Sequence, residues 1–220
     1  MTPVQDQIEW RQSHAPVAYD DAVSFMEQRV SDIHENRAPG CVWLLEHPAL
    51  YTGGTSAKAQ DLLSPSFPVH ATGRGGEYTY HGPGQRVAYV MMDLKKMQKT
   101  PDLRAYIHTL EEWVIRALKE FDIAGERRAG RVGIWVDLKK YGRPGEAKIA
   151  AIGVRVRKWV AYHGVSINVN PDLSHYAGIV PCGIAEHGVT SFSDLGIGAA
   201  MTVLDQALQR QFNSTFYGVE

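Results

Sequence analysis

Cys182 is the first candidate for covalent chemistry. It stands between Pro181 and Gly183, in the run Ile-Val-Pro-Cys-Gly-Ile, where a thiol could be presented at a turn. A free cysteine has a pKa of about 8.5, so only a small fraction is thiolate at neutral pH. Lowering that pKa by about 1.5 units corresponds to roughly 2 kcal/mol, which one close cation in a partly desolvated site can supply. A nucleophilic Cys182 therefore needs a cationic neighbour; otherwise it is a small buried residue.

Lys148 is the candidate neighbour, because it opens the apolar run Ile-Ala-Ala-Ile-Gly at residues 149–153. As the cation it could stabilise a thiolate, and after losing its proton it could act as a general base. Two alternatives stay open. Lys148 could extend from a strand end into water, or His163 or His81 could be the base of a Cys–His pair.

Histidines near the cysteine also raise the question of a metal site. His81, His163, His175 and His187 are spaced from Cys182 in no recurrent ligand pattern, so we expect no metal. Residues 73–85 contain neither the Gly-Lys-Ser/Thr of a phosphate-binding loop nor the glycine spacing of a dinucleotide-binding fold.

The stretch from Gly73 to Gln85 reads Gly-Arg-Gly-Gly-Glu-Tyr-Thr-Tyr-His-Gly-Pro-Gly-Gln. Glycine allows close backbone approach, so glycines beside Arg74, Tyr80 and His81 suggest a loop wrapped around a ligand. The alternative is a tight hairpin connection, since Gly-Pro-Gly is typical of turns.

Composition excludes several classes of protein. The 220 residues carry a formal net charge of −1 and are 44% apolar, which argues against disorder and against general nucleic-acid or anionic-membrane binding. Cys41 and Cys182 lie far apart, so neither a disulfide framework nor a zinc knuckle is indicated. No stretch resembles a signal peptide or a membrane span. We expect a soluble, cytoplasmic protein.

Hydrophobic spacing predicts the elements that must position these side chains. Helical periodicity predicts a helix at residues 20–36, with Asp20 or Asp21 as cap, a long helix that starts after Pro101 and extends to Phe121, and a helix at 201–216. Strands are predicted at 8–11, 41–45, 87–94, 132–136, 149–156 and 160–169, with a hairpin corner at 155–159 and a Gly-Gly loop at 51–56. In the strand at 132–136, one face is expected to point inward. Together these elements predict one α+β domain over residues 1–220, a mixed, largely antiparallel sheet flanked by helices.

Several separated motifs occur together in a characteristic order. They are Arg74-Gly75-Gly76, Thr79-Tyr80-His81-Gly82-Pro83-Gly84-Gln85, Lys148-Ile149-Ala150, Tyr162-His163-Gly164, Ile179-Val180-Pro181-Cys182-Gly183-Ile184 and Gly188-Val189-Thr190-Ser191. With these motifs the chain resembles the lipoyl(octanoyl) transferases, across most of its length. The resemblance implies the fold of biotin and lipoate protein ligases.

The resemblance also implies roles for particular residues. Cys182 would be the acyl-thioester nucleophile, and Lys148 the residue that lowers its pKa. The implied substrate contacts are Arg74, Gly75, Gly76, Glu77, Tyr78, Thr79, Tyr80, His81, Ala151, Ile152, Gly153, Gly164, Val165 and Ser166.

Such an enzyme would move an octanoyl group from acyl carrier protein to a lysine of a lipoyl domain, without ATP, cofactor or metal. Acceptors would be the lipoyl domains of 2-oxoacid dehydrogenase complexes and the glycine cleavage H protein. Backbone N–H groups near Gly164 to Ser166 or Cys182 are the expected oxyanion donors. Candidate walls of an acyl slot are Tyr78, Tyr80 and residues 150–153.

Basic residues could guide the acidic carrier protein, although a solvated polar face also explains them. They are Arg127, Arg128, Arg131, Lys139, Lys140 and Arg143. Two other functions remain open: an ATP-dependent lipoate or biotin ligase, which needs no cysteine, and a non-catalytic carrier-binding module of the same fold.

Overall fold

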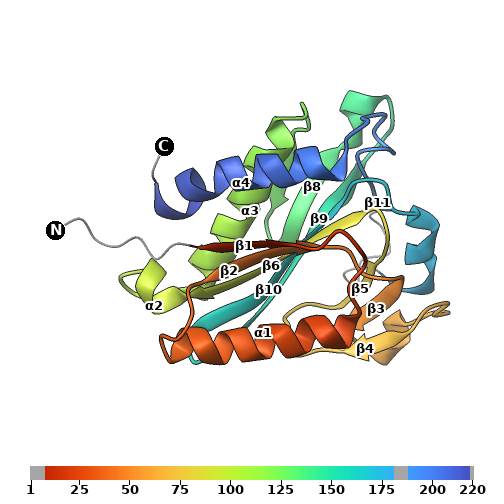
Figure 1. The fold of residues 1–220 in the computed structure, drawn as a ribbon. Coiled ribbons are helices and arrows are strands. Elements are labelled where there is room, and N and C mark those ends of the chain that lie inside the picture. Colours follow the sequence, from red (N-terminus) through yellow and green to blue (C-terminus); the bar gives the residue numbers. More distant parts are fainter. Residues whose placement is uncertain (1–7, 181–187, 219–220) are drawn as a thin grey trace.

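A large mixed sheet runs through the molecule, with helices on both of its faces (Figure 1). The computed structural model describes residues 8–180 and 188–218. The strands of this sheet are β1 (Glu9–Gln12), β2 (Cys41–Leu45), β6 (Gln85–Asp93), β7 (Gly125–Arg128), β8 (Arg131–Asp137), β9 (Glu146–Arg157), β10 (Val160–Asn168) and β11 (Gly188–Val189). Their spatial order is β1-β2-β6-β10-β9-β8-β7, with β11 beside β9. β1 with β2 and β11 with β9 are parallel pairs, and the other pairs are antiparallel. The predicted mixed, largely antiparallel sheet is confirmed.

A second, small sheet has the order β4-β3-β5. Its strands are β3 (Leu50–Gly53), β4 (Val69–Ala71) and β5 (Tyr78–His81). The loop predicted at 51–56 is therefore partly wrong, because residues 51–53 pair with both β4 and β5. The glycine-rich stretch is divided: residues 73–77 form a loop, β5 follows, and Gly82 to Gly84 make the turn into β6. The interpretation as a loop thus applies to residues 73–77, and the interpretation as a turn applies to Gly82 to Gly84.

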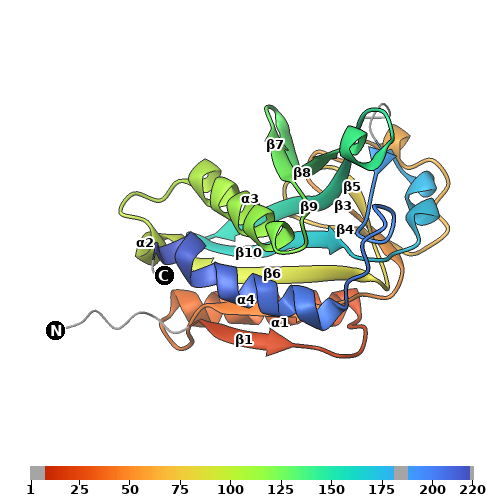
Figure 2. The same ribbon diagram turned by 90° about the horizontal axis from the view of Figure 1, so that it is seen from above.

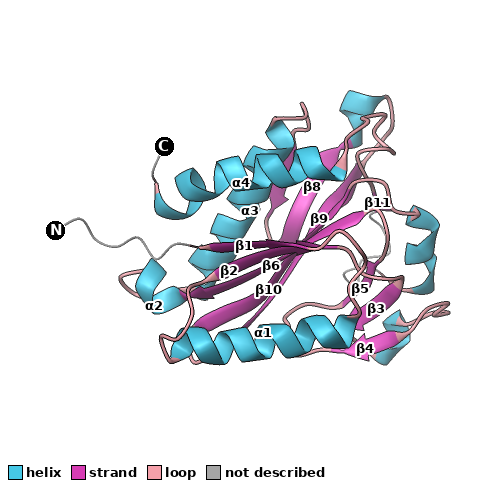
Figure 3. Cartoon of the chain, in the orientation of Figure 1, coloured by secondary structure: helices cyan, strands magenta, loops and turns pink. Residues whose placement is uncertain are grey.

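Helices cover the large sheet unequally, as the view from above shows (Figure 2). α1 (Tyr19–His34) packs on one face, whereas α3 (Leu103–Lys119) and α4 (Met201–Tyr217) pack on the other (Figure 3). A short α2 (Leu94–Met97) follows β6, and 3₁₀ turns lie at Ala59–Asp61, Leu138–Tyr141 and Leu173–Gly178. Two apolar cores result, one on each face of the sheet.

The start of α3 agrees with the prediction from the sequence, whereas the start of α1 differs from it. α3 begins after Pro101, as predicted, and Asp102 caps it by accepting hydrogen bonds from the N–H groups of Arg104 and Ala105. The cap predicted for α1 is wrong, because Ala18 occupies that position without a side-chain hydrogen bond. Asp20 and Asp21 lie in the first turn instead, where a carboxylate still interacts favourably with the helix dipole.

β8 does not have the predicted single inward face. Ile134, Trp135 and Val136 are all buried, while Val132 is 47% exposed. Ile134 and Val136 belong to the core under α3 and α4. Trp135 lies on the opposite face of the strand, where Arg131 and Lys148 cover its ring. Both faces of the strand are therefore occupied, one by the core and one by charged side chains.

The β9–β10 hairpin positions most of the residues discussed below. Its corner lies at Lys158 and Trp159, both with positive φ (53° and 66°), which suits a tight two-residue turn. In its register Gly164 pairs with Gly153, and Ser166 with Ala151. Two predicted substrate-contact segments are thus adjacent. In the part of the chain that the structure describes, no helix is long and apolar enough to cross a membrane.

Candidate active site

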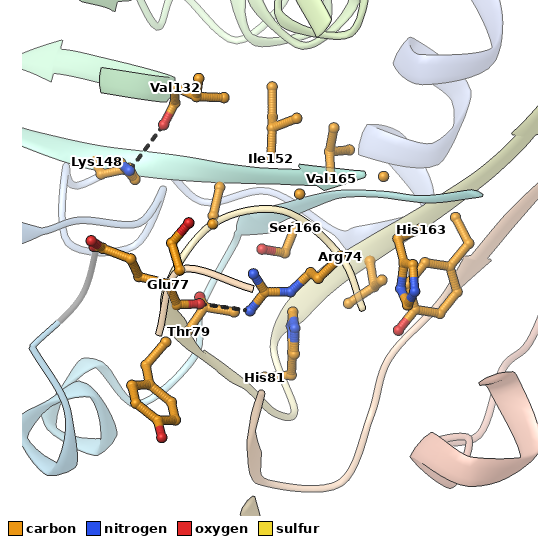
Figure 4. A pocket seen from close by; sticks show the side chains of 18 of the residues that line it. Arg74, Glu77, Thr79, His81, Val132, Lys148, Ile152, His163, Val165 and Ser166 are labelled. Carbon is orange, nitrogen blue, oxygen red and sulfur yellow. Dashed lines mark hydrogen bonds between the residues drawn. The ribbon is translucent and has the colours of Figure 1, made fainter. Parts of the chain in front are cut away.

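A cavity of about 270 Å³ lies over the β9–β10 hairpin, beneath the loop that precedes β5 (Figure 4). Lys148 stands at one end and His163 at the other, with Ile152, Val165 and Ser166 between them. All the predicted substrate contacts except Gly75 and Tyr80 line it. The cavity brings together residues about ninety positions apart in the sequence, such as Arg74 and Ser166. Strand pairing in the folded protein places them side by side.

Lys148 does not extend into bulk water. Its residue is only 7% exposed, and its Nζ donates a hydrogen bond of 3.0 Å to the carbonyl oxygen of Val132. The ammonium also lies 4.8 Å from the centre of the Trp135 ring. A carbonyl acceptor and an aromatic face both favour a cation, so β8 holds Lys148 in place at the cavity end.

Cys182 lies outside the described residues, and so does His187. The chain on either side of it is described. Val180 donates its N–H to the carbonyl oxygen of Asp61, and β11 pairs Gly188 with Ala147 and Val189 with Lys148. After residue 187, the described chain therefore resumes beside Lys148.

Arg74 has a clear structural role. It is 8% exposed, and its guanidinium donates hydrogen bonds to the carbonyl oxygens of Thr52, Gly75 and Glu77 at 2.9, 2.9 and 3.0 Å. A fourth bond, of 2.7 Å, goes to Thr52 Oγ1. These bonds tie the loop of residues 74–77 to the end of β3, so Arg74 anchors the roof of the cavity.

Gly153 allows the loop to approach the sheet. A Cβ atom at this position would lie 2.8 Å from Arg74 Cδ and 3.1 Å from the carbonyl oxygen of Gly75. The N–H of Gly75 in turn bonds to the carbonyl oxygen of Val154 at 2.9 Å. The backbone of Gly75 thus attaches the loop to β9, and Gly75 does not line the cavity. At residue 153, only glycine fits without a shift of the loop.

His81 and His47 form a buried polar layer beneath the loop. His81 Nδ1 donates to Gln85 Oε1 at 2.7 Å, because the Gln85 amide nitrogen already donates to Tyr80, Asn168 and Tyr176. His47 Nδ1 donates to the carbonyl oxygen of Val17 at 2.6 Å, so Tyr89 donates its hydroxyl hydrogen to His47 Nε2 at 2.7 Å.

These imidazoles are neutral at physiological pH. Burial lowers the pKa of His81 to about 3 and that of His47 to about 4. Burial, then the nearby Arg74 and Arg155, lowers the pKa of His163 to about 3. A group with so low a pKa is a poor general base at neutral pH, so these side chains fit positioning roles better than proton transfer.

His163 has an unusual backbone for a strand residue. Its φ is 62°, in the left-handed region that non-glycine residues seldom adopt. Its ring stacks on Tyr162 at 5.0 Å and meets the edge of Tyr89 at 5.9 Å, measured between ring centres. Such strain persists only where surrounding contacts fix it, and it is often found at functional sites.

Tyr80 lies apart from the cavity that it was predicted to line. Its side chain is buried among Tyr51, Phe67 and Tyr176, and its hydroxyl lies 2.8 Å from His175 Nδ1. In β5 successive side chains point to opposite sides, and Thr79 and His81 take the cavity side. Substrate contact by Gly75 and Tyr80 stays a prediction.

Other cavity residues were missed from the sequence, among them Tyr19, Tyr89 and Val132. Tyr19 begins a helix, and Tyr89 stands in a run of β6 that is buried throughout, so both resembled ordinary core residues. The sequence contains no local signal for these positions. The feature that comes nearest to such a signal is a polar aromatic residue inside an otherwise apolar strand, as at Tyr89.

Most of the candidate guiding residues are already paired with carboxylates. Arg127 bonds to Glu112 at 2.7 Å, and Arg128 and Arg131 both reach Glu146 at 2.5 Å. Arg143 bonds to Asp194 at 3.0 Å. Lys139 and Lys140 are exposed in the turn after β8. The arginines therefore neutralise local carboxylates, and this surface is less positive than the sequence suggests.

Neither a metal site nor a reactive thiol emerges within residues 8–180 and 188–218. No three His, Cys, Asp or Glu side chains of these ranges gather as a metal ion would require. Cys41 is fully buried in β2, and burial raises its pKa to about 11. Cys41 therefore belongs to the apolar core beneath α1.

Comparison with known proteins decides the family. The model of the lipoyl protein ligase A/B catalytic domain matches residues 18–213. An octanoyltransferase of Rhodospirillum rubrum is 60% identical over 210 residues, which are 95% of each chain. The chain belongs to the octanoyltransferases of this family. It is a transferase, as the motifs at residues 74–85, 148–150 and 179–191 predicted.

Further relatives agree. The octanoyltransferase of Parvibaculum lavamentivorans is also 60% identical, over 94% of this chain and 92% of its own. Among solved structures, a bipartite lipoate protein ligase of Thermoplasma acidophilum superposes with a TM-score of 0.71 at 15% identity, covering 95% of this chain and 84% of that one. At that identity the likeness concerns the fold alone, and the predicted ligase-like fold is confirmed.

Proposed function

We propose that this octanoyltransferase moves an octanoyl group from acyl carrier protein to a specific lysine of lipoyl domains, through a thioester on Cys182. Residues 1–220 act as one catalytic domain, in the cytoplasm. The observation that carries the proposal is a buried lysine at one end of a partly apolar cavity, in a chain 60% identical to octanoyltransferases. Acceptors are the lipoyl domains of 2-oxoacid dehydrogenase complexes and the glycine cleavage H protein.

The first half-reaction acylates the enzyme. The Cys182 thiolate attacks the thioester carbonyl of octanoyl carrier protein, and the carrier thiolate leaves and takes its proton from the Lys148 ammonium, which becomes a neutral amine. Lys148 as ammonium stabilises the Cys182 thiolate, because an opposite charge close by favours the ionised thiol. The hydrogen bond from Lys148 to Val132 and the contact with the Trp135 face support this role, since they hold the lysine side chain at the end of the cavity.

The second half-reaction releases the acyl group. The amine of the acceptor lysine loses a proton to Lys148 and attacks the Cys182 thioester, so that an amide forms and the Cys182 thiolate is restored. Exchange of one thioester for another is nearly neutral and thioester to amide is downhill. The reaction therefore needs neither ATP nor a cofactor.

Donors for the developing oxyanion are expected near Cys182. The alternative donors, the N–H groups of Gly164 to Ser166, belong to β10, which pairs with β6 on one side and β9 on the other at these residues. In a strand paired on both sides the backbone donors point along the sheet to its neighbours, not out of its face. We therefore favour the N–H groups around Cys182.

Mass spectrometry after incubation with octanoyl carrier protein tests the proposal. We expect one octanoyl group on wild-type protein, its loss on addition of a lipoyl domain, and no adduct on Cys182→Ser at neutral pH. Cys41→Ser is the matched control, since that thiol is buried in the core and its adduct formation should equal wild type. Octanoyl transfer that requires ATP and proceeds without an adduct would favour a ligase and contradict the proposal.

A further inference from the structure

Asn168, the last residue of β10, contacts the chain on both sides of the segment that carries Cys182. Its Oδ1 accepts a hydrogen bond of 3.1 Å from the hydroxyl of Tyr176, which stands before that segment. Its Nδ2 donates a bond of 3.0 Å to the carbonyl oxygen of Thr190, which stands after it. A single side-chain amide thus joins the described chain before residues 181–187 to the described chain after them.

The partners of the Asn168 amide fix its orientation. The carbonyl oxygen of Thr190 can only accept a hydrogen bond, so the amide nitrogen of Asn168 must face it. The amide oxygen then faces the Tyr176 hydroxyl and Gln85 Nε2, the latter at 2.9 Å. Asn168 is 4% exposed, and Gln85, its partner in the pairing of β10 with β6, is fully buried. Loss of these bonds would leave buried polar groups without a partner, so the amide is held firmly.

The chain after the segment leads directly to Lys148. The N–H of Thr190 donates to the carbonyl oxygen of Lys148 at 2.9 Å, and Val189 pairs with Lys148 in the sheet. The carbonyl oxygen of Asn168 also accepts the N–H of Phe192 at 3.1 Å. Residues 188–192 are therefore attached both to the strand that carries Lys148 and to the end of β10.

The chain before the segment is held by aromatic packing and by backbone bonds. Tyr176 is 7% exposed, and its ring meets the edge of the Tyr80 ring with 5.3 Å between the centres. Farther along, the N–H of Val180 donates to the carbonyl oxygen of Asp61 at 2.8 Å. Both flanks of residues 181–187 are thus fixed points of the fold, and Asn168 sets the separation between them.

We propose that Asn168 is a positioning residue of the transfer reaction, which by joining the two flanks sets how closely Cys182 approaches Lys148. This inference rests on the proposed function, because it requires the Cys182 thiolate and the Lys148 ammonium to act as a pair. Doubling the separation of two charges halves their attraction, so a less closely held thiol ionises less readily. Asn168 does not line the cavity, and its replacement therefore leaves the cavity lining itself unchanged.

Two variants release the clamp to different degrees. Asn168→Ala removes the bonds to both flanks, whereas Tyr176→Phe removes only the bond to the first flank and keeps the ring in its packing. Tyr176→Phe also keeps the test open if Asn168→Ala does not fold. Tyr106→Phe is the matched control, because it too removes the hydroxyl of a buried tyrosine, but on α3. All variants are made in Cys41→Ser protein, in which Cys182 is the only thiol.

The measurement is the rate at which iodoacetamide alkylates Cys182 as a function of pH, which gives the pKa of the thiol. We expect a pKa below about 8.5 in the parent protein and a pKa about one unit higher in Asn168→Ala, which is roughly a tenfold smaller thiolate fraction at neutral pH. Tyr176→Phe should raise the pKa by less, and Tyr106→Phe should leave it unchanged. Octanoyl adduct formation should slow in the same order, with the donor KM retained. A mere loss of stability would change the amount of folded protein and not the pH at which Cys182 ionises.

Two results would overturn the inference. One is an unchanged Cys182 pKa in both Asn168→Ala and Tyr176→Phe, even if activity falls, because Asn168 would then only stabilise the fold. The other is an equal pKa shift in Tyr106→Phe, because any loss of a buried hydrogen bond would then have the same effect. Failure of the proposed function is distinguishable, since the parent protein would then form no octanoyl adduct and Lys148→Met would leave the Cys182 pKa unchanged.

Discussion

Lys148 combines burial with two contacts that favour its charge. It donates to the carbonyl oxygen of Val132 and faces the Trp135 ring. The proposed mechanism gives it two tasks, stabilising a thiolate as a cation and accepting a proton as a base. These tasks can be separated, because an arginine can do the first and not the second.

Replacement of Lys148 should therefore give two different defects. Lys148→Met removes both tasks, and we expect acylation and overall transfer to fall by about 10²–10⁴-fold. Lys148→Arg should retain the octanoyl adduct but release it to the lipoyl domain far more slowly. Adduct formation and decay are followed by mass spectrometry, with Lys139→Met in the exposed turn as control. Equal loss of both half-reactions in Lys148→Arg would contradict the separation of tasks.

Arg74 acts on the site through the loop that it anchors. Its guanidinium bonds to Thr52, Gly75 and Glu77, and a hydrogen bond to a charged group contributes about 1.5–3 kcal/mol. We therefore expect the defect of Arg74 variants to originate in a loosened roof over the cavity.

Arg74→Ala should lower the free energy of unfolding by about 2–4 kcal/mol, since several buried carbonyl groups lose their partner. The donor KM should rise more than kcat falls, and amides of residues 74–77 should exchange hydrogen faster. Thr52→Val, which keeps the Thr52 carbonyl acceptor, should show a smaller change. A fall in kcat alone, with unchanged exchange in the loop, would instead indicate direct contact with the reacting group.

At the scale of elements, the site depends on how closely one loop approaches one hairpin. The N–H of Gly75 bonds to Val154 on β9, and the missing side chain of Gly153 leaves the space for Arg74. Because the loop is attached at both points, its position follows that of β9. A small change in β9 should therefore alter the cavity roof.

Gly153→Ala tests this contact. Its Cβ would lie 2.8 Å from Arg74 Cδ and 3.1 Å from the carbonyl oxygen of Gly75, so the loop must shift. We expect a loss of about 1–3 kcal/mol in the free energy of unfolding and a clear rise in the donor KM. Gly198→Ala is the control, since no atom lies within 4 Å of a Cβ there. Activity and urea unfolding of Gly153→Ala equal to those of the control would show that the loop tolerates displacement.

At the scale of the whole molecule, burial of neutral histidines ties folding to pH. His47, His81 and His163 have pKa values of about 4, 3 and 3 in the folded protein, against about 6.5 in an unfolded chain. Between these values the unfolded chain binds more protons than the folded one. Acidification therefore favours unfolding, and the stability present above about pH 6.5 is lost as the pH falls.

The free energy of unfolding should accordingly decrease below about pH 6.5, by up to about 1.4 kcal/mol per pH unit for each of these histidines. Urea unfolding at pH 7.5, 6.0 and 5.0 measures the slope. His47→Asn keeps a donor for the Val17 carbonyl and removes one titrating group, so its slope should be shallower. Equal unfolding free energies at pH 7.5 and 5.0 would mean that these side chains are protonated in the folded protein.

Much of the fold follows from local patterns in the sequence. The apolar run at residues 41–45 forms β2 at its predicted bounds, and the helix after Pro101 begins with Asp102 as cap. Predictions failed where distant segments decide: residues 51–53 form a strand only because β4 and β5 pair with them. Alternation along β8 predicted that Trp135 would lie on the exposed face, opposite Ile134 and Val136. Trp135 is nevertheless buried, because the charged side chains of Arg131 and Lys148 cover its ring.

The sequence by itself determined which chemistry is available, since a thiol, a lysine beside an apolar run and the ordered motifs are local features. Tertiary structure decided which residues share a cavity, and so added Tyr19, Tyr89 and Val132. It also showed that Arg74 anchors the roof. The physical reason is that sheet register and side-chain packing join positions far apart in the chain. They also hold the backbone of His163 in a conformation that no local pattern indicates.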